Sequence, residues 1–323
     1  MENLVQVDRQ TPFLMPQDLK DWLPKNHIIH FIIDAVEAVS ANVSFHLNKR
    51  GSGSKQFNPE MMMELLIYSY CTKRFSSYAI EKATYTDIPT MYITAMEHPD
   101  HNTINNFRKN NREAFKKVFT QLLLLAQTTG LMKKIGTISV LKNAVKQMEE
   151  TQKEMIQKKM PKEPENKVDD KAQVNFTDSE SRIMKFGNSN NFEQSYNLQA
   201  AVDTDSKMIV GTYPTQKCND KAELKNCVES VPEELEKEEK VFVCADTGYF
   251  SSSLIEKTEE GQKIYSKRKT TVEPVFGIIK RVMGFRQFLM RGLENIGIEW
   301  DLVTISYNIS RMYALKKLSL AKM

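Results

Sequence analysis

The hydrophobic pattern of this chain changes its period once, near residue 130, and this change limits the possible folds more than any other feature. From residue 27 to 130, apolar side chains recur at steps of three and four residues, which is typical of amphipathic helices. From Ile135 onward, short apolar runs with strand-like alternation appear. We therefore predict an all-helical part followed by a part that contains a β-sheet.

The helical part is predicted to consist of several helices joined by short loops. Apolar residues follow helical spacing across residues 27–47, and the glycine- and serine-rich stretch 49–55 forms a loop after them. Pro59 suits the first position of the next helix, a short helix follows at 78–84, and Asp87 opens a turn.

The longest helical pattern follows these elements. Asn102 is predicted to cap its beginning, and Gly130 is suited to end it in a left-handed conformation. Between them, apolar residues recur at helical spacing from Ile104 to Leu125. We predict one continuous helix here.

The second part predicts an α+β fold class that is mostly helical over the whole chain. We expect four strands, at residues 135–141, 195–203, 208–214 and 240–246. A hairpin turn at 203–206 joins the second and third strands, and helices are expected at 220–231 and in the last 50 residues. The charge-rich stretch 142–172 is predicted to be an exposed helix followed by a flexible linker.

These patterns divide the chain into three parts. Residues 1–26 are an N-terminal arm, residues 27–134 a helical domain, and residues 135–323 a second domain that the charged linker 142–172 interrupts.

Several function classes are disfavoured by composition. No run of 18 apolar residues exists to span a bilayer, and the charged N-terminus does not resemble a signal peptide, so we expect a cytoplasmic protein. The four cysteines form no CxxC pair and so do not indicate a zinc site. Residues 264–323 hold eleven Lys or Arg against four Asp or Glu, which favours contact with a polyanion; the alternative is a solvated basic helix face.

Two acidic residues occupy unusual positions. Asp246 follows an apolar strand, where α/β sheets place their ligands. Glu273 precedes Pro274 at the start of an otherwise apolar helix, where an unpaired carboxylate is costly and a partner or metal is expected. The alternative for Glu273 is a salt bridge to a neighbouring lysine or to Arg281.

A polar and basic helix start after residue 100 is the candidate for reading DNA. Asn and Arg side chains pair with adenine and guanine edges, and the helix at 78–84 would support it as in a helix-turn-helix arrangement. The alternative is a polar helix on a helical bundle. The candidate side chains are Asn102, Thr103, Asn105, Asn106, Arg108, Lys109 and Arg112.

Several motifs together resemble the DDE transposases of bacterial insertion sequences. In the second half these are residues 175–185, Tyr196-Asn-Leu-Gln-Ala-Ala-Val-Asp203, Cys244-Ala-Asp-Thr-Gly-Tyr-Phe250, Tyr265-Ser-Lys-Arg-Lys-Thr-Thr-Val-Glu-Pro-Val-Phe-Gly-Ile-Ile-Lys280 and 284–293. In the first half, residues 57–71, 75–82 and 98–109 resemble the helical N-terminal domain of this family. The resemblance covers nearly the whole chain apart from the linker.

The resemblance implies a ribonuclease-H-like catalytic domain that carries out DNA transposition and recombination on the double-stranded ends of its element. In such domains three acids hold two divalent ions, Mg²⁺ or Mn²⁺, which activate the attacking oxygen and stabilise the leaving one. Asp246 would be the second acid and Glu273 the third. Tyr265, Arg268 and Lys280 would steady the phosphate backbone or Glu273, and the adjacent Arg281 would contact DNA. The protein would be associated with the nucleoid.

The match to this family fails at two places. The first acid should follow the first strand, but Val140 is followed by Leu141, and no carboxylate occurs before Glu149. The family also has a further strand and a long insertion after Asp246, which are missing here. We therefore interpret the chain as an internally deleted copy that binds DNA but does not transpose. Three acids could in principle replace the first one: Asp203, Asp178 and Asp170.

Alternative functions remain open. The chain could be a non-catalytic DNA-binding protein that represses related full-length transposases or poisons their dimers, and it could form a homodimer itself. A nuclease with a different set of acids is a third reading. The missing strand also predicts that residues 240–245 form a sheet edge beside exposed apolar residues, and hence poor solubility.

Overall fold

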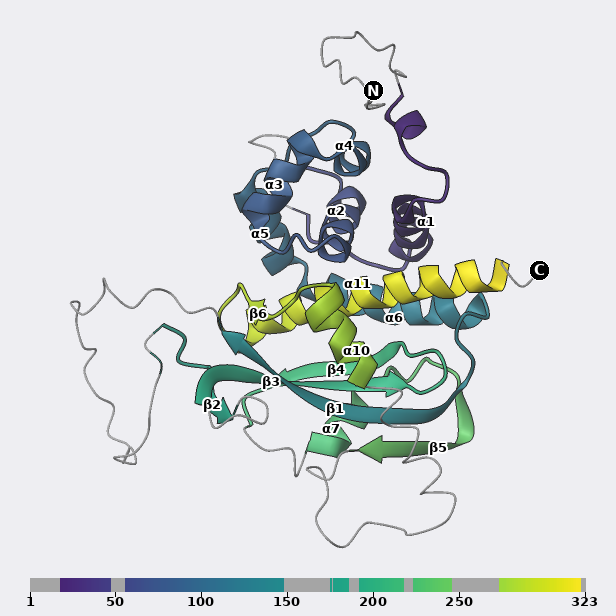
Figure 1. Ribbon diagram of the computed structural model, residues 1–323, viewed down its shortest axis with the longest axis vertical. Helices are drawn as coiled ribbons and strands as arrows, with labels where there is room; N and C mark the ends of the chain where they lie inside the picture. Colours follow the sequence, from purple (N-terminus) through teal and green to yellow (C-terminus); the bar gives the residue numbers. More distant parts are fainter. Residues whose placement is uncertain are drawn as a thin grey trace, which may run out of the picture.

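The computed structural model describes residues 18–47, 56–147, 175, 177–185, 192–217, 223–245 and 273–320, with the backbone alone at 141–147, Lys185 and Glu273. Figure 1 shows the helices α1 to α5 on one side of the long helix α11 and the sheet on the other. Among the residues that the structure describes, no helix is both long enough and apolar enough to cross a membrane.

The first half of the chain, which we call the helical half, holds only helices among its described residues up to Thr128. They are η1 (Leu19–Trp22, a 3-10 helix), α1 (Ile28–Ser40), α2 (Pro59–Cys71), α3 (Ser77–Thr86), α4 (Ile88–Thr94), α5 (His101–Asn110) and α6 (Arg112–Thr128). Pro59 begins α2 as predicted, since Asn58 caps the backbone N–H of Glu60 at 2.7 Å.

The prediction of one continuous helix from Asn102 to Gly130 is wrong. Asp100, rather than Asn102, caps α5 through the backbone N–H of Thr103 at 2.6 Å, so the helix begins two residues earlier than predicted. Asn111 then separates α5 from α6. Its side chain accepts the backbone N–H of His46 at 2.7 Å and donates to the carbonyl of Phe107 at 2.9 Å. These bonds favour a break over a continuous helix.

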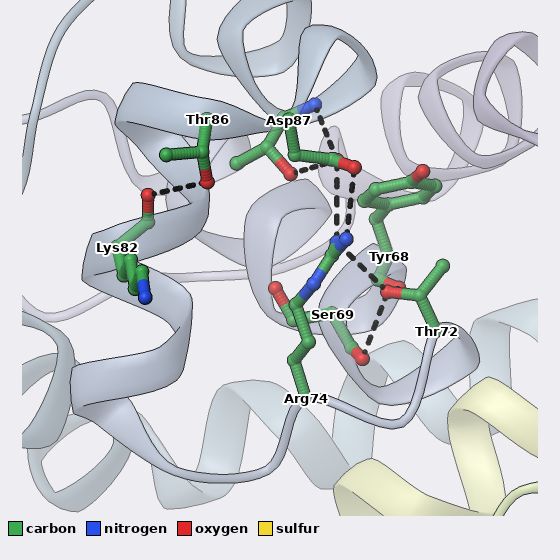
Figure 2. Close-up of polar contacts among 8 residues, drawn as sticks. Tyr68, Ser69, Thr72, Arg74, Lys82, Thr86 and Asp87 are labelled. Atoms are coloured by element: carbon green, nitrogen blue, oxygen red, sulfur yellow. Dashed lines mark hydrogen bonds and ion pairs between the residues drawn. The ribbon is translucent and has the colours of Figure 1, made fainter.

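A bidentate ion pair joins the end of α2 to the beginning of α4 (Figure 2). Arg74, after α2, contacts both carboxylate oxygens of Asp87, at 2.8 and 3.2 Å. Asp87 also caps α4 by accepting the Thr90 hydroxyl at 2.6 Å and its backbone N–H at 3.2 Å. Burial opposes ionisation of Asp87, but the bonds from Thr90 and Arg74 outweigh it and lower the pKa of the carboxyl.

The second half, which we call the sheet half, begins with the mixed sheet. Its strands are β1 (Ile135–Gln147), β2 (Arg182–Lys185), β3 (Phe192–Asp203), β4 (Ile209–Thr215), β5 (Lys237–Ala245) and β6 (Gln287–Phe288). β3 pairs antiparallel with β1, β2 and β4, whereas β5 and β6 pair parallel with β1. The predicted hairpin at 203–206 is confirmed, and so is the α+β class.

The helix expected from residue 142 is wrong for the described residues 142–147. They extend β1, and the antiparallel register continues as far as the pair Lys146–Ser195. The long neighbouring strand β3 supplies backbone partners that the charged sequence did not indicate. The rest of the predicted linker, 148–172, lies outside the described residues.

Helices cover both faces of the sheet. They are α7 (Glu223–Glu229), α10 (Glu273–Gly277), which continues as a π-helical turn (Ile278–Val282), and α11 (Leu293–Leu320). Trp300 of α11 stacks on Phe276 of α10 with 6.2 Å between ring centroids and donates to Thr212 of β4, so α10 and α11 share one face. Gly211 faces the end of α7 on the other side, close to Val231.

A single apolar core runs through both halves. α11 contacts α2 and α6 on one side and β4 on the other. Ile296, Trp300, Val303 and Tyr307 of α11 are buried, whereas Tyr313 is half-exposed and donates to the carbonyl of Asn26. Burying α11 between the halves accounts for its apolar residues around the whole circumference.

Candidate functional site

One exposed polar stripe runs along α5. Asn102, Asn106 and Lys109 are exposed, and their spacing of four and three residues places them on one helix face. Ile104 is buried on the opposite face. The stripe carries amide and ammonium groups, which suit base edges and phosphates respectively.

Arg108 does not belong to this stripe, although the sequence analysis counted it as a DNA contact. Its side chain is 2% exposed, and its Nη1 donates to the Tyr70 hydroxyl and to the carbonyl of Phe75, both at 3.1 Å. Arg108 follows Ile104 by four residues and therefore shares the buried face of α5. A side chain enclosed in this way is not available to DNA in this conformation.

The neighbouring candidates Thr103 and Asn105 are half-buried. Asn105 donates to the Ser77 hydroxyl of α3 at 3.1 Å, and Glu81 of α3 accepts His101 Nδ1 at 2.8 Å. α3 therefore supports α5, as predicted. A helix-turn-helix arrangement of these two helices is wrong, because α4 lies between α3 and α5 in the chain.

Arg112, the last DNA-binding candidate of the helical half, lies in the first turn of α6. It contacts Glu294 of α11, with 2.6 Å between Nη1 and Oε1. The pair therefore joins the helical half to the sheet half.

The predicted metal site begins where β1 and β5 pair in parallel. Val140 of β1 is the partner of Ala245 of β5, the last residue of that strand. In the sequence, Leu141 follows the first and Asp246 follows the second. Asp246 lies outside the described residues, as do Tyr265 and Arg268.

The third predicted acid, Glu273, is the first residue of α10. Val275, Phe276 and Ile279 are buried on the apolar side of this helix and its π-helical continuation, and Phe276 stacks on Trp300 of α11. Lys280 is half-buried, and burial lowers the pKa of its ammonium group, whereas Arg281 is exposed.

The donor set does not fit the metal pair that the resemblance implies. No Asp or Glu occurs anywhere in β1, from Ile135 to Gln147. Among the described residues, no three His, Cys, Asp or Glu side chains gather in a group that could hold a metal ion.

The two described substitute acids are engaged elsewhere. Asp203 accepts the hydroxyl and backbone N–H of Ser206 at 2.6 and 2.8 Å, and burial raises its pKa despite these bonds. Asp178 accepts the Tyr196 hydroxyl at 2.8 Å and the backbone N–H of Gly292 at 3.2 Å. Asp170 lies outside the described residues.

Sequence reasoning missed Glu299 in α11. Its carboxylate is fully buried and accepts the backbone N–H groups of Leu289 and Met290, at 3.0 to 3.2 Å. Burial raises its pKa to about 7, although those two bonds favour the charged form. The sequence did offer one signal for a buried carboxylate, because Glu299 stands next to Trp300 in an apolar helix. Glu299 fixes the loop between α10 and α11.

Two family models match the chain. One is described as a transposase domain (DUF772) and matches residues 17–110, and the other is described as a transposase DDE domain and matches residues 188–313. Together they span about two thirds of the sequence. No curated protein and no solved structure matches it. The first model covers the helices that carry the polar stripe, and the second covers β3 to α11. The chain therefore belongs to the DDE transposases of insertion sequences.

Proposed function

We propose that this transposase binds DNA through α5 but does not cleave or transfer strands, because its metal site lacks the first acid. DDE transposases use divalent metal ions in general, and a pair of Mg²⁺ or Mn²⁺ ions needs several carboxylates at fixed positions. Asp246 and Glu273 remain as the second and third acids in this proposal. Two carboxylates do not supply the required coordination.

The parallel pairing of Val140 with Ala245 carries this proposal. The order of the strands supports a ribonuclease-H-like domain, since β3 is antiparallel to both β1 and β4, and β5 is parallel to β1. In such a domain the first acid follows the first strand and the second acid follows a later strand. By this register Leu141 occupies the chain position that corresponds to Asp246. A leucine offers no oxygen to a metal ion.

The engagement of Asp203 and Asp178 supports the same conclusion. Asp203 is opposite Ile138 in the pairing of β3 with β1, two residues before Val140, and its carboxylate holds the hairpin turn. Recruiting it as a ligand would break the turn, and ionising it would work against its raised pKa. Asp178 would have to leave Tyr196 and Gly292.

A cleavage assay tests this function. The wild-type chain is incubated with Mg²⁺ or Mn²⁺ and a duplex that carries the end sequences of its own element. We expect DNA to be bound and to remain intact. Metal-dependent nicking or strand transfer that disappears in Asp246→Ala would contradict the proposal, because it would require a complete active site.

The second candidate function is interference with related full-length transposases at the same DNA ends. The intact stripe on α5, together with the incomplete acid set, favours it. We expect co-expression to lower transposition by a full-length relative, and Lys109→Ala to relieve this effect. Unchanged transposition at equal protein levels would exclude interference. In this account the protein is cytoplasmic and nucleoid-associated.

The missing first acid and shortened segment after Asp246 also support descent by internal deletion. Sequencing the coding DNA around codons 140–143 and 254–262, with its flanks, tests this origin. We expect deletion scars and inverted terminal repeats; an uninterrupted ancestral frame would contradict descent by deletion.

A further inference from the structure

The contact between Arg112 and Glu294 lies at the edge of a cavity of about 400 Å³. Residues 44–46, residues 110–114 and Glu294 line this cavity. Asn110 follows Lys109 directly in the sequence, so the cavity adjoins the carboxyl end of the polar stripe on α5.

Both partners of the ion pair stand on a fixed backbone. Asn111, directly before Arg112, is held by its bonds to His46 and Phe107. The start of α11, directly before Glu294, is held by Glu180, which accepts the backbone N–H of Leu293 at 2.6 Å. The backbone beside each partner of the ion pair is therefore held in place.

The guanidinium of Arg112 also has unused capacity for hydrogen bonding. Its Nε is buried and has no hydrogen-bond partner among the described residues, while Nη1 contacts Glu294. Guanidinium groups bind carboxylate and phosphate oxygens in the same planar, forked geometry. Glu294 is 73% exposed on its side chain, so a competing anion can reach this position from solvent.

We infer that this cavity is a subsite for one phosphate of the DNA backbone, and that Glu294 occupies the anion position on Arg112 until DNA displaces it. This inference rests on the proposed DNA binding by α5 and deepens it, because it adds a contact beyond the stripe and an internal competitor. DNA binding would then break a contact between the helical half and the sheet half.

Binding to an arbitrary 30-base-pair fluorescein-labelled duplex tests the inference, since phosphate contacts do not depend on sequence. The dissociation constant is measured by fluorescence anisotropy at low salt for wild type and Glu294→Gln. The matched control is Glu113→Gln, which removes the same charge at the same cavity but leaves the Arg112 pair intact. Circular dichroism verifies that each variant is folded.

We expect Glu294→Gln to bind about threefold to fivefold more tightly than Glu113→Gln, since exposed ion pairs are weak competitors. Arg112→Gln should weaken binding and lower the salt dependence by about 0.9 in the logarithmic slope. In the Arg112→Gln background, the advantage of Glu294→Gln over Glu113→Gln should disappear.

Equal affinities of Glu294→Gln and Glu113→Gln, with measurable binding by wild type, would overturn the inference and leave the DNA-binding function intact. Absence of binding by both wild type and Glu294→Gln at low salt would contradict the DNA-binding function as well. Binding by Glu294→Gln alone would support strong competition by Glu294.

Discussion

Val140 of β1 and Ala245 of β5 are direct partners in the parallel part of the sheet. The residues that follow them differ in chemical character, since the apolar Leu141 follows Val140 and the acidic Asp246 follows Ala245. This relationship connects the fold to the proposed loss of activity. A catalytic domain of this family needs acids on both strands, and here one position is apolar.

The stripe on α5 and the buried Arg108 should respond differently to mutation. Lys109→Ala should leave stability within about 0.5 kcal/mol of wild type and weaken duplex binding. Arg108→Ala should cost roughly 2–4 kcal/mol, because it opens a cavity and removes the partner of the Tyr70 hydroxyl. Urea unfolding and fluorescence anisotropy measure the two effects. If Arg108→Ala weakened DNA binding without loss of stability, the structural role assigned to Arg108 would be wrong.

Glu64 of α2 should make stability depend on pH. Burial, and to a smaller extent Glu37 and Glu60, raises the pKa of its carboxyl from 4.5 to about 8. Because the folded state holds this proton more tightly than the unfolded state, wild-type stability should fall as pH rises from about 4.5 to about 8.

Glu64→Gln should remove that fall and be more stable than wild type by roughly 2–4 kcal/mol at pH 9, but not at pH 4. Urea denaturation at both pH values measures the difference, with Glu97→Gln on an exposed turn as the control. Parallel pH profiles for wild type and Glu64→Gln would contradict the assignment.

The shared core predicts that the two halves unfold together. Phe285 is 1% exposed and packs edge-on against Phe75 and Phe288, at 5.3 and 5.4 Å between ring centroids. Phe285→Ala should cost roughly 3–5 kcal/mol and preserve a single transition. The exposed Phe192 provides the control, since Phe192→Ala should change stability by less than about 0.5 kcal/mol. Separate transitions by tryptophan fluorescence and circular dichroism would contradict a shared core.

The edge strand β5 predicts self-association. Phe242 and Val243 are 40% and 37% exposed on a strand that has β1 as its only partner among the described residues. Phe242→Lys should lower the fraction of aggregate in light scattering, because a charge on an edge strand opposes pairing with another chain. Phe192→Lys, at an exposed phenylalanine on β3, which pairs with β1, β2 and β4, should have a smaller effect. Equal improvement by both would argue against edge pairing.

Local sequence patterns predicted most of the helices and strands. The runs 195–203 and 208–214 were recognisable as strands because a turn sequence separates two apolar, alternating segments. Exposed apolar residues on β5 were also predicted, and Phe242 and Val243 are exposed, whereas only the last two residues of this strand are buried. The domain boundaries and the acids of the site stay predictions.

Tertiary contacts account for the elements that were missed. Residues 142–147 are strand because β3 continues beside them, which no local charge pattern shows. The break at Asn111 depends on His46, which is 65 positions away. Arg108 could have been recognised as buried, since it follows Ile104 at helical spacing. It was assigned to DNA binding instead because its side chain is basic.

Metal binding by Leu141→Asp tests the central claim most directly. Calorimetric titration with Mn²⁺ compares wild type, Leu141→Asp and the double variant Leu141→Asp with Asp246→Ala. We predict weak or no binding by wild type, measurable binding by Leu141→Asp, and loss of that binding in the double variant. Tight Mn²⁺ binding by wild type that Asp246→Ala abolishes would contradict the claim that the site lacks its first acid.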